Sequence, residues 1–222
     1  MNRVSSSIKG LDELLDGGLP EKHSVLLSGT CGTGKTIFGL QFLLASKSPC
    51  VFVTFEDEMD DLRDTAKTFG WEMKSLEASN KVRLLRYDPF RLADILEVIE
   101  NNIREIGATR VVLDSVSALG MYMKDAPELR RTLLQIVRVM KKNSCTTIIT
   151  SEVPSGSQAF SRFGVEEFVT DGVIVLGNTL VDGEFKRTLH ISKMRNVNHS
   201  RKLHIYNITE NGFVVTPKVL IR

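Results

Sequence analysis

Long apolar segments are missing from this sequence. Residues 1–9 contain no apolar stretch typical of a signal peptide, and no apolar run in the 222 residues approaches the roughly 20 residues that a membrane-spanning helix needs. We therefore expect a cytoplasmic protein that has no membrane contact.

Cysteine is also scarce, and neither sign of charge is in excess. The three cysteines, Cys31, Cys50 and Cys145, are odd in number and widely spaced, which excludes a disulfide framework and a zinc cluster. The 29 Lys and Arg nearly balance the 27 Asp and Glu, so the formal charge is only +2. No overall charge favours nucleic acid or an anionic membrane, although a local basic patch stays open. We expect reduced thiols.

Short β-branched runs alternate with stretches of helical spacing through the first two thirds of the chain. The expected strands are residues 24–28, 50–55, 82–87, 110–113 and 146–150, and the expected helices are residues 35–45, 58–69, 91–106 and 127–142. This alternation predicts an α/β fold with a mostly parallel sheet covered on both faces. The length fits one such domain better than two, so we predict a single domain over residues 1–222.

The last third of the chain has a different pattern. A polar segment at 154–164 is followed by strand-like runs at 172–176, 185–193, 202–206 and 213–216, with a turn signal at 181–183. We predict antiparallel strands that continue the sheet at its carboxyl-terminal side.

A phosphate-binding loop follows the first expected strand. Its residues are Gly29, Thr30, Cys31, Gly32, Thr33, Gly34, Lys35 and Thr36. The glycines let backbone amides turn toward a phosphate, Lys35 can reach the β- and γ-phosphates, and the Thr36 hydroxyl can ligate Mg²⁺. The pattern predicts binding of ATP with Mg²⁺ and its hydrolysis. Cys31 is either a spacer in this loop or a redox-sensitive thiol.

Acidic residues close the neighbouring strands, where the chemistry of such sheets takes place. Asp114 ends the run 110–113 and is predicted to hold Mg²⁺ through a water molecule. Glu56 and Asp57 follow the run 50–55, where Glu56 can polarise the attacking water and Asp57 can cap the next helix. Residues 150–152 either sense the γ-phosphate or form a simple loop entry.

With these motifs the chain resembles the RecA-like ATPases, and among them the single-domain relatives of the clock protein KaiC. The resemblance extends over residues 8–20, 29–36, 52–57, 69–71, 112–115, 162–171 and 191–199. It implies a ring, typically a hexamer, with ATP at each subunit interface and the catalytic base in the pair Glu56 and Asp57. It also implies that Lys193 and Arg195 reach the neighbour's γ-phosphate.

The same resemblance places His199, Glu210 and Thr68 near the neighbour's nucleoside, and adds Met194 to the nucleotide contacts. Without the resemblance, Lys193 and Arg195 would be interpreted as two cations on the solvated face of a strand, because alternate residues of a strand share one face. The sequence departs from the family pattern after Arg195, where Asn196-Val197 replaces Gly-Thr. Glu166-Glu167 stands where the clock protein's second domain is autophosphorylated, so we expect no autokinase activity.

Three functions fit these residues. The first is a slow ATPase ring that regulates or remodels an unidentified protein partner. The second is a relative of the recombinases that binds single-stranded DNA through residues 117–127 and 154–164, which contain only Lys124 and Arg162 as cations but also Tyr122, Phe160 and Phe163 for stacking. The third is a scaffold in which ATP stabilises the ring without turnover.

Overall fold

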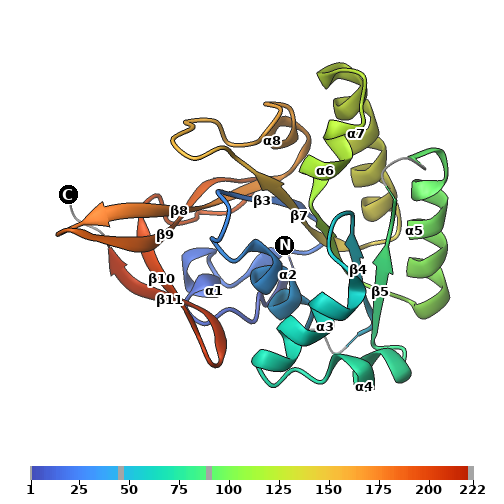
Figure 1. The fold of residues 1–222 in the computed structure, drawn as a ribbon, viewed down its shortest axis with the longest axis horizontal. Coiled ribbons are helices and arrows are strands. Elements are labelled where there is room, and N and C mark those ends of the chain that lie inside the picture. Colours follow the sequence, from blue (N-terminus) through green and yellow to red (C-terminus); the bar gives the residue numbers. More distant parts are fainter. Residues whose placement is uncertain (1, 45–47, 89–91, 220–222) are drawn as a thin grey trace.

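A nine-stranded sheet organises the computed structural model, which describes residues 2–44, 48–88 and 92–219 (Figure 1). The strand order is β11-β10-β9-β8-β3-β7-β6-β4-β5, and a separate small sheet pairs β1 with β2. The strands of the large sheet are β3 (Ser24–Gly29), β4 (Cys50–Thr54), β5 (Val82–Arg86), β6 (Arg110–Asp114), β7 (Thr146–Glu152), β8 (Gly172–Val181), β9 (Glu184–Met194), β10 (His204–Thr209) and β11 (Gly212–Val219). The small sheet contains β1 (Arg3–Val4) and β2 (Leu19–Pro20).

The direction of the strands confirms the predicted fold class. From β8 to β5 neighbouring strands are parallel, whereas β9, β10 and β11 are antiparallel to their neighbours. The first group alternates with helices along the chain, as parallel pairing requires, whereas the second is joined by two-residue turns at 182–183 and 210–211 and by the loop 195–203. The mixed sheet therefore follows from the change of pattern after residue 150.

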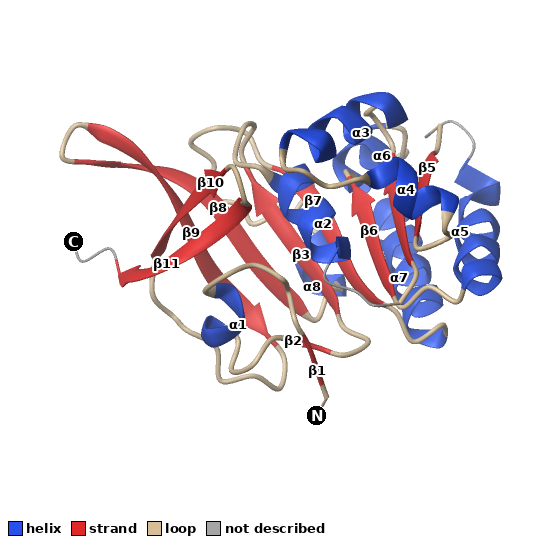
Figure 2. Cartoon of the chain, turned by 90° about the horizontal axis from the view of Figure 1, so that it is seen from below, coloured by secondary structure: helices blue, strands red, loops and turns tan. Residues whose placement is uncertain are grey.

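Helices cover both faces of the parallel part of the sheet (Figure 2). They are α1 (Leu11–Leu14), α2 (Lys35–Leu44), α3 (Met59–Thr68), α4 (Met73–Ala78), α5 (Leu92–Ile106), α6 (Val116–Met121), α7 (Ala126–Lys142) and α8 (Glu166–Val169). The four long helices were predicted, with residues 45 and 91 of those predictions lying outside the described part of the chain. The short helices α1, α4, α6 and α8 were missed, because four to six residues are too few to show a helical period.

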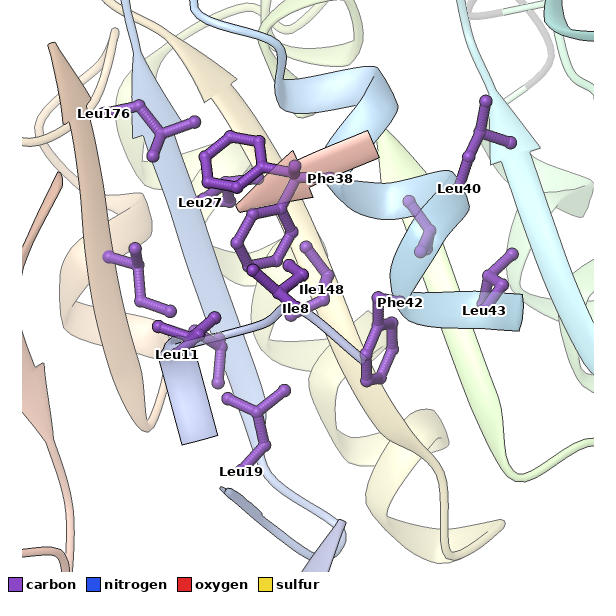
Figure 3. Packing of buried hydrophobic residues seen from close by; sticks show 14 of the residues in the cluster. Ile8, Leu11, Leu19, Leu27, Phe38, Leu40, Phe42, Leu43, Ile148 and Leu176 are labelled. Atoms are coloured by element: carbon purple, nitrogen blue, oxygen red, sulfur yellow. The ribbon is translucent and has the colours of Figure 1, made fainter. Parts of the chain in front are cut away.

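Two apolar clusters lie on opposite sides of the sheet. Alternate residues of β3 separate between them, since Val25 and Leu27 belong to one cluster and Leu26 to the other. The first cluster packs α2 onto the sheet through Phe38, which lies over Leu27 (Figure 3). This packing fixes the start of α2, and with it the loop between β3 and α2.

The hairpin of β8 and β9 is longer than predicted. Its two-residue turn, Asp182 and Gly183, has φ angles of 51° and 82°, which suit Asp-Gly in a type I′ turn. In the register of β8 on β3, Leu176 lies opposite Gly29, so residues 177–181 continue beyond the end of β3. This extension was missed because it has little hydrophobic alternation, and it forms the arm seen at the left of Figure 1.

Candidate active site

The loop between β3 and α2 has the shape that a phosphate requires. Gly32 and Gly34 have φ angles of 75° and 84°, a region that favours glycine. The Thr33 hydroxyl donates to the Thr30 carbonyl oxygen (2.8 Å), and the Tyr206 hydroxyl donates to the Thr33 carbonyl oxygen (2.6 Å). The loop is therefore held from within and from β10.

Lys35 lies inside this loop with only 7 % of its surface exposed. Its Nζ donates to the carbonyl oxygens of Gly29 (3.2 Å) and Thr30 (3.1 Å), and it forms an ion pair with Glu152 Oε1 at 3.3 Å. A buried ammonium needs such partners. The loop's own carbonyls thus hold the cation beside the backbone amides that would surround a phosphate.

Asp114 lies at the carboxyl end of β6 and receives hydrogen bonds from two hydroxyls, one on α2 and one on β7. Thr36 Oγ1 donates to Oδ2 at 2.7 Å and Thr150 Oγ1 donates to Oδ1 at 2.5 Å. Burial raises the pKa of the Asp114 carboxyl above its usual value, while these two hydrogen bonds and nearby Lys35 act in the opposite direction. A divalent cation bound here would relieve the penalty for the buried charge.

These two oxygen donors fit Mg²⁺. The ion prefers hard oxygen ligands and is commonly bound by one or two protein groups together with substrate phosphates and water. Thr36 and Asp114 supply such a pair at the edge of the loop. The described residues contain no group of three His, Cys, Asp or Glu side chains suited to a metal, so an all-protein cage is absent from the part of the chain that can be seen.

Glu56 and Asp57 lie at the end of β4, on the far side of the same cleft. Ser115 Oγ donates to Glu56 Oε2 at 2.9 Å, and Ser115 follows Asp114 directly, so this hydrogen bond holds the Glu56 carboxylate near Asp114. The backbone N–H of Asp57 donates to Thr54 Oγ1 at 2.9 Å. Burial, and then the charges of Asp114 and Glu56, raise the pKa of the Asp57 carboxyl. The acidic pair thus makes a strongly negative wall opposite the phosphate loop.

The loop and the acidic residues enclose a cleft of about 380 Å³. Its lining residues are Gly32, Gly34, Lys35, Thr36, Ile37, Glu56, Asp57, Asp61, Leu62, Thr65, Asp114, Ser115 and Glu152. Sequence reasoning missed the α3 residues of this set, Asp61, Leu62 and Thr65, and the role of Ser115. For Glu152 the sequence left two interpretations open, a sensor of the γ-phosphate or a simple loop entry. In the structure Glu152 ends β7 beside Lys35.

Lys193 and Arg195 lie at the opposite end of the sheet. Met194 pairs with Gly172 and Gly172 with Val25, four residues before Gly29, which is about 13 Å along the strand. Lys193 Nζ donates to the carbonyl oxygens of Glu167 (2.9 Å) and Thr170 (2.5 Å). Burial and neighbouring Arg195 lower its pKa. The two cations therefore do not line the cleft of their own chain.

The other predicted nucleotide contacts are spread over the molecule. Thr68 ends α3 and donates to the carbonyl oxygen of Thr65, which lines the cleft. The Met194 side chain is buried in the core against Gly172, so only its backbone can meet a ligand. His199 lies in the loop before Ser200, whose N–H donates to the Leu14 carbonyl oxygen.

Glu210 is separated from that group. It lies in the turn between β10 and β11, where Ile208 contacts Gly34 and Gly212 contacts Gln41 of α2. The antiparallel strands β10 and β11 therefore place the turn with Glu210 on the side of its own phosphate loop. Sequence alone could not show this position.

The family described as "ATPase: KaiC" matches residues 4–219. The chain belongs to the KaiC ATPase family. It is 36 % identical to a UPF0273 protein of Methanocaldococcus jannaschii, over 100 % of this chain and 99 % of the relative. It is 35 % identical to the circadian clock oscillator protein KaiC of Synechococcus elongatus, over 97 % of this chain but 44 % of the clock protein. A solved KaiC-like protein from Pyrococcus horikoshii superposes with a TM-score of 0.89, at 39 % identity over 97 % of this chain and 99 % of that one.

Membership of the KaiC family confirms the predicted resemblance and makes the chain an ATP-binding ATPase domain of the RecA superfamily.

The two segments considered for DNA binding lie against each other in this domain, because the Phe163 ring packs on Gly120 of α6 and is half-buried. Phe160 is 40 % exposed and Tyr122 is 45 % exposed. No described helix has the length and apolar character to cross a membrane.

Proposed function

We propose that this KaiC-family chain hydrolyses ATP slowly with Mg²⁺ in the cleft between the phosphate loop and Glu56. The observation that carries the proposal is the direct contact of Thr36 with Asp114 at the edge of that loop, with Glu56 held by the next residue, Ser115. Thr36 comes from α2, Asp114 from the end of β6 and Glu56 from the segment after β4, so the three side chains converge only through the fold. They provide the metal ligands and the base of a phosphoryl-transfer site.

Each residue has a role that its position supports. Lys35 would exchange Glu152 for the β- and γ-phosphates, and the amides of residues 32–36 would surround them. Bound Mg²⁺ would neutralise developing negative charge. Glu56 would accept the proton of the attacking water, with its carboxylate oriented by Ser115. Asp57, close to both carboxylates, would share the work of positioning that water.

We further propose that a second copy of the chain completes the site. Lys193 and Arg195 are too far from their own phosphate loop along the sheet, so they can act on a γ-phosphate only from a neighbouring subunit. Two different patches of one chain then meet, and such a contact gives a ring when the rotation between subunits closes; we expect a closed hexamer. His199 and the Met194 backbone would follow Lys193 to the neighbour's nucleotide, and Thr68 would contact the nucleotide of its own chain.

The ring would act as a regulatory or remodelling device on a protein partner. Residues 1–222 would form a single domain, since the first and last thirds of the chain both contribute strands to one sheet. Because ATP is drawn from the cytoplasmic nucleotide pool, the proposal also assigns the chain to the cytoplasm. DNA binding, and the use of ATP only to stabilise the ring, are the two alternative functions.

Two measurements on one pair of variants test this function. Phosphate release and binding of a fluorescent ATP analogue would be compared between wild type, Lys35→Ala and a control, Lys22→Ala, whose exposed lysine lies outside the cleft. We expect Mg²⁺-dependent release from wild type and the control, and a loss of both binding and release in Lys35→Ala. Release that is equal in all three proteins would overturn the assignment of the cleft.

A further inference from the structure

Phe168 is the most exposed large side chain near the two cations. It is 63 % exposed and belongs to α8, whose residue Glu167 accepts a hydrogen bond from Lys193 through its carbonyl oxygen. A phenyl ring that keeps most of its surface in water gains little from the folding of its own chain. The exposed Phe168 therefore lies beside the half-buried Lys193, at the end of the sheet away from the cleft.

A second cavity lies beside the phosphate loop, on the side of β8. It has a volume of about 620 Å³, and its walls include Thr30 of the loop, the apolar side chains of Val175 and Phe185, and the polar segment 155–158. Phe185 is 76 % exposed at its rim. The cavity therefore offers apolar surface with room for an aromatic ring, and its wall adjoins the position of a bound phosphate.

Phe168 and the cavity each lie next to a backbone carbonyl that accepts a hydrogen bond from a lysine, Lys193 for Phe168 and Lys35 for the cavity. Phe168 follows Glu167, whose carbonyl oxygen is 2.9 Å from Lys193 Nζ. The cavity is lined by Thr30, whose carbonyl oxygen is 3.1 Å from Lys35 Nζ. If Lys193 of one subunit approaches the phosphate that Lys35 of the next subunit holds, Phe168 is carried to the wall formed by Thr30.

We infer that Phe168 of one subunit packs into the cavity beside the phosphate loop of the next, with Val175 and Phe185 beside its ring. The inference rests on the proposed function, because it requires a second copy to bring Lys193 to the cleft. It adds an apolar contact that anchors the interface and fixes the distance of the trans cations from the nucleotide. The occupant is another copy of this chain, since an exposed ring and a cavity at two different places on one molecule join copies head to tail.

Site-directed crosslinking tests this contact directly. Phe168→Cys and Ser157→Cys would each be made in a chain with Cys31→Ser, since Cys50 and Cys145 are buried. Ser157 lines the cavity. The two proteins would be mixed with ATP and Mg²⁺ and treated with a short bismaleimide. In randomly mixed rings about a quarter of the interfaces pair the two cysteines, so we expect a covalent dimer that approaches about half of the chains, and less than a tenth as much with Leu180→Cys in place of Phe168→Cys.

Leu180 is the matched control because it is 61 % exposed but lies near the tip of the β8–β9 hairpin, away from α8. Native mass measurement on the same samples separates the two claims. A ring that forms without the Phe168–Ser157 crosslink, or with equal crosslinking from Leu180, overturns this contact and leaves the proposed function standing. A chain that stays monomeric with ATP and Mg²⁺ overturns both.

Discussion

Thr36 Oγ1 lies 2.7 Å from Asp114 Oδ2, although 78 positions separate the two residues in sequence. The contact joins the first turn of α2 to the end of β6, and β7 adds Thr150 on the other carboxylate oxygen. Parallel strands that end at one edge of the sheet produce this convergence. Every role that we propose for the cleft depends on it.

The first prediction concerns the base. Glu56→Gln keeps the shape of the side chain and its contact with Ser115 but cannot accept a proton. We expect the rate of phosphate release to fall by about 100-fold or more, which is the usual contribution of a general base. Binding of the fluorescent ATP analogue should change by less than about threefold, because Lys35 and the loop amides are intact.

Glu58→Gln is the control for that variant. Glu58 is two residues away and pairs with Arg86 at 2.9 Å, but it does not line the cleft. Its turnover should match wild type. A Glu56→Gln protein that retains turnover within twofold would show that another group, with Glu152 as the first to examine, activates the water.

The second prediction is a pH dependence that Asp114 causes in the nucleotide-free protein. Its pKa in the folded chain is raised above the ordinary value of 3.8, so the folded state binds this proton more tightly than the unfolded state does. The free energy of unfolding therefore falls as the pH rises from about 4 through the raised pKa. Asp114→Asn removes this loss, because an amide carries no charge.

Urea unfolding between pH 4 and pH 8, without ATP or Mg²⁺, measures the difference. The gain in stability of Asp114→Asn over wild type should grow with pH and then level off, while its phosphate release should be lost. A constant difference across the range would mean that the Asp114 carboxylate is not held at an energetic penalty.

The third prediction concerns the support of the phosphate loop from β10. The Tyr206 side chain is fully buried, and its hydroxyl donates to the Thr33 carbonyl oxygen at 2.6 Å. Tyr206→Phe leaves that carbonyl without its partner, which should lower the free energy of unfolding by about 1–3 kcal/mol. ATP binding should weaken with it, because the loop loses a restraint. If Tyr206→Phe is less stable than wild type but binds ATP with the same affinity, Tyr206 supports only the core and not the nucleotide site.

The sequence predicted the parts of the fold that depend on local pattern. Buried runs such as 110–113 and the loop 29–36 were found because their composition or spacing is unusual. The position of Glu210 was not, since it depends on how β10 and β11 curve over α2, and no local pattern reports that. Ser115 was also missed as a support for Glu56, because a serine after an acidic residue carries no signal until the fold brings Glu56 to it.

The same limit applies to the trans site. The motif around Lys193 identified the cations, but their distance from the phosphate loop follows from the strand order and the register of β8 between β3 and β9. Met194 shows the complementary case. A residue between two functional neighbours was assigned with them, and the alternation of the strand turns its side chain into the core.

Mixing two inactive variants tests the shared site most directly. Glu56→Gln lacks the base and Arg195→Ala lacks the cation supplied to a neighbour, so each protein alone should release almost no phosphate. In rings of equal, random composition, an Arg195→Ala subunit often lies beside a Glu56→Gln subunit whose Arg195 is intact, and roughly a quarter of the interfaces are then complete. We predict recovery of roughly that share of wild-type turnover. Mixed rings confirmed by native mass measurement that show no recovered turnover would contradict a site completed by a neighbouring subunit.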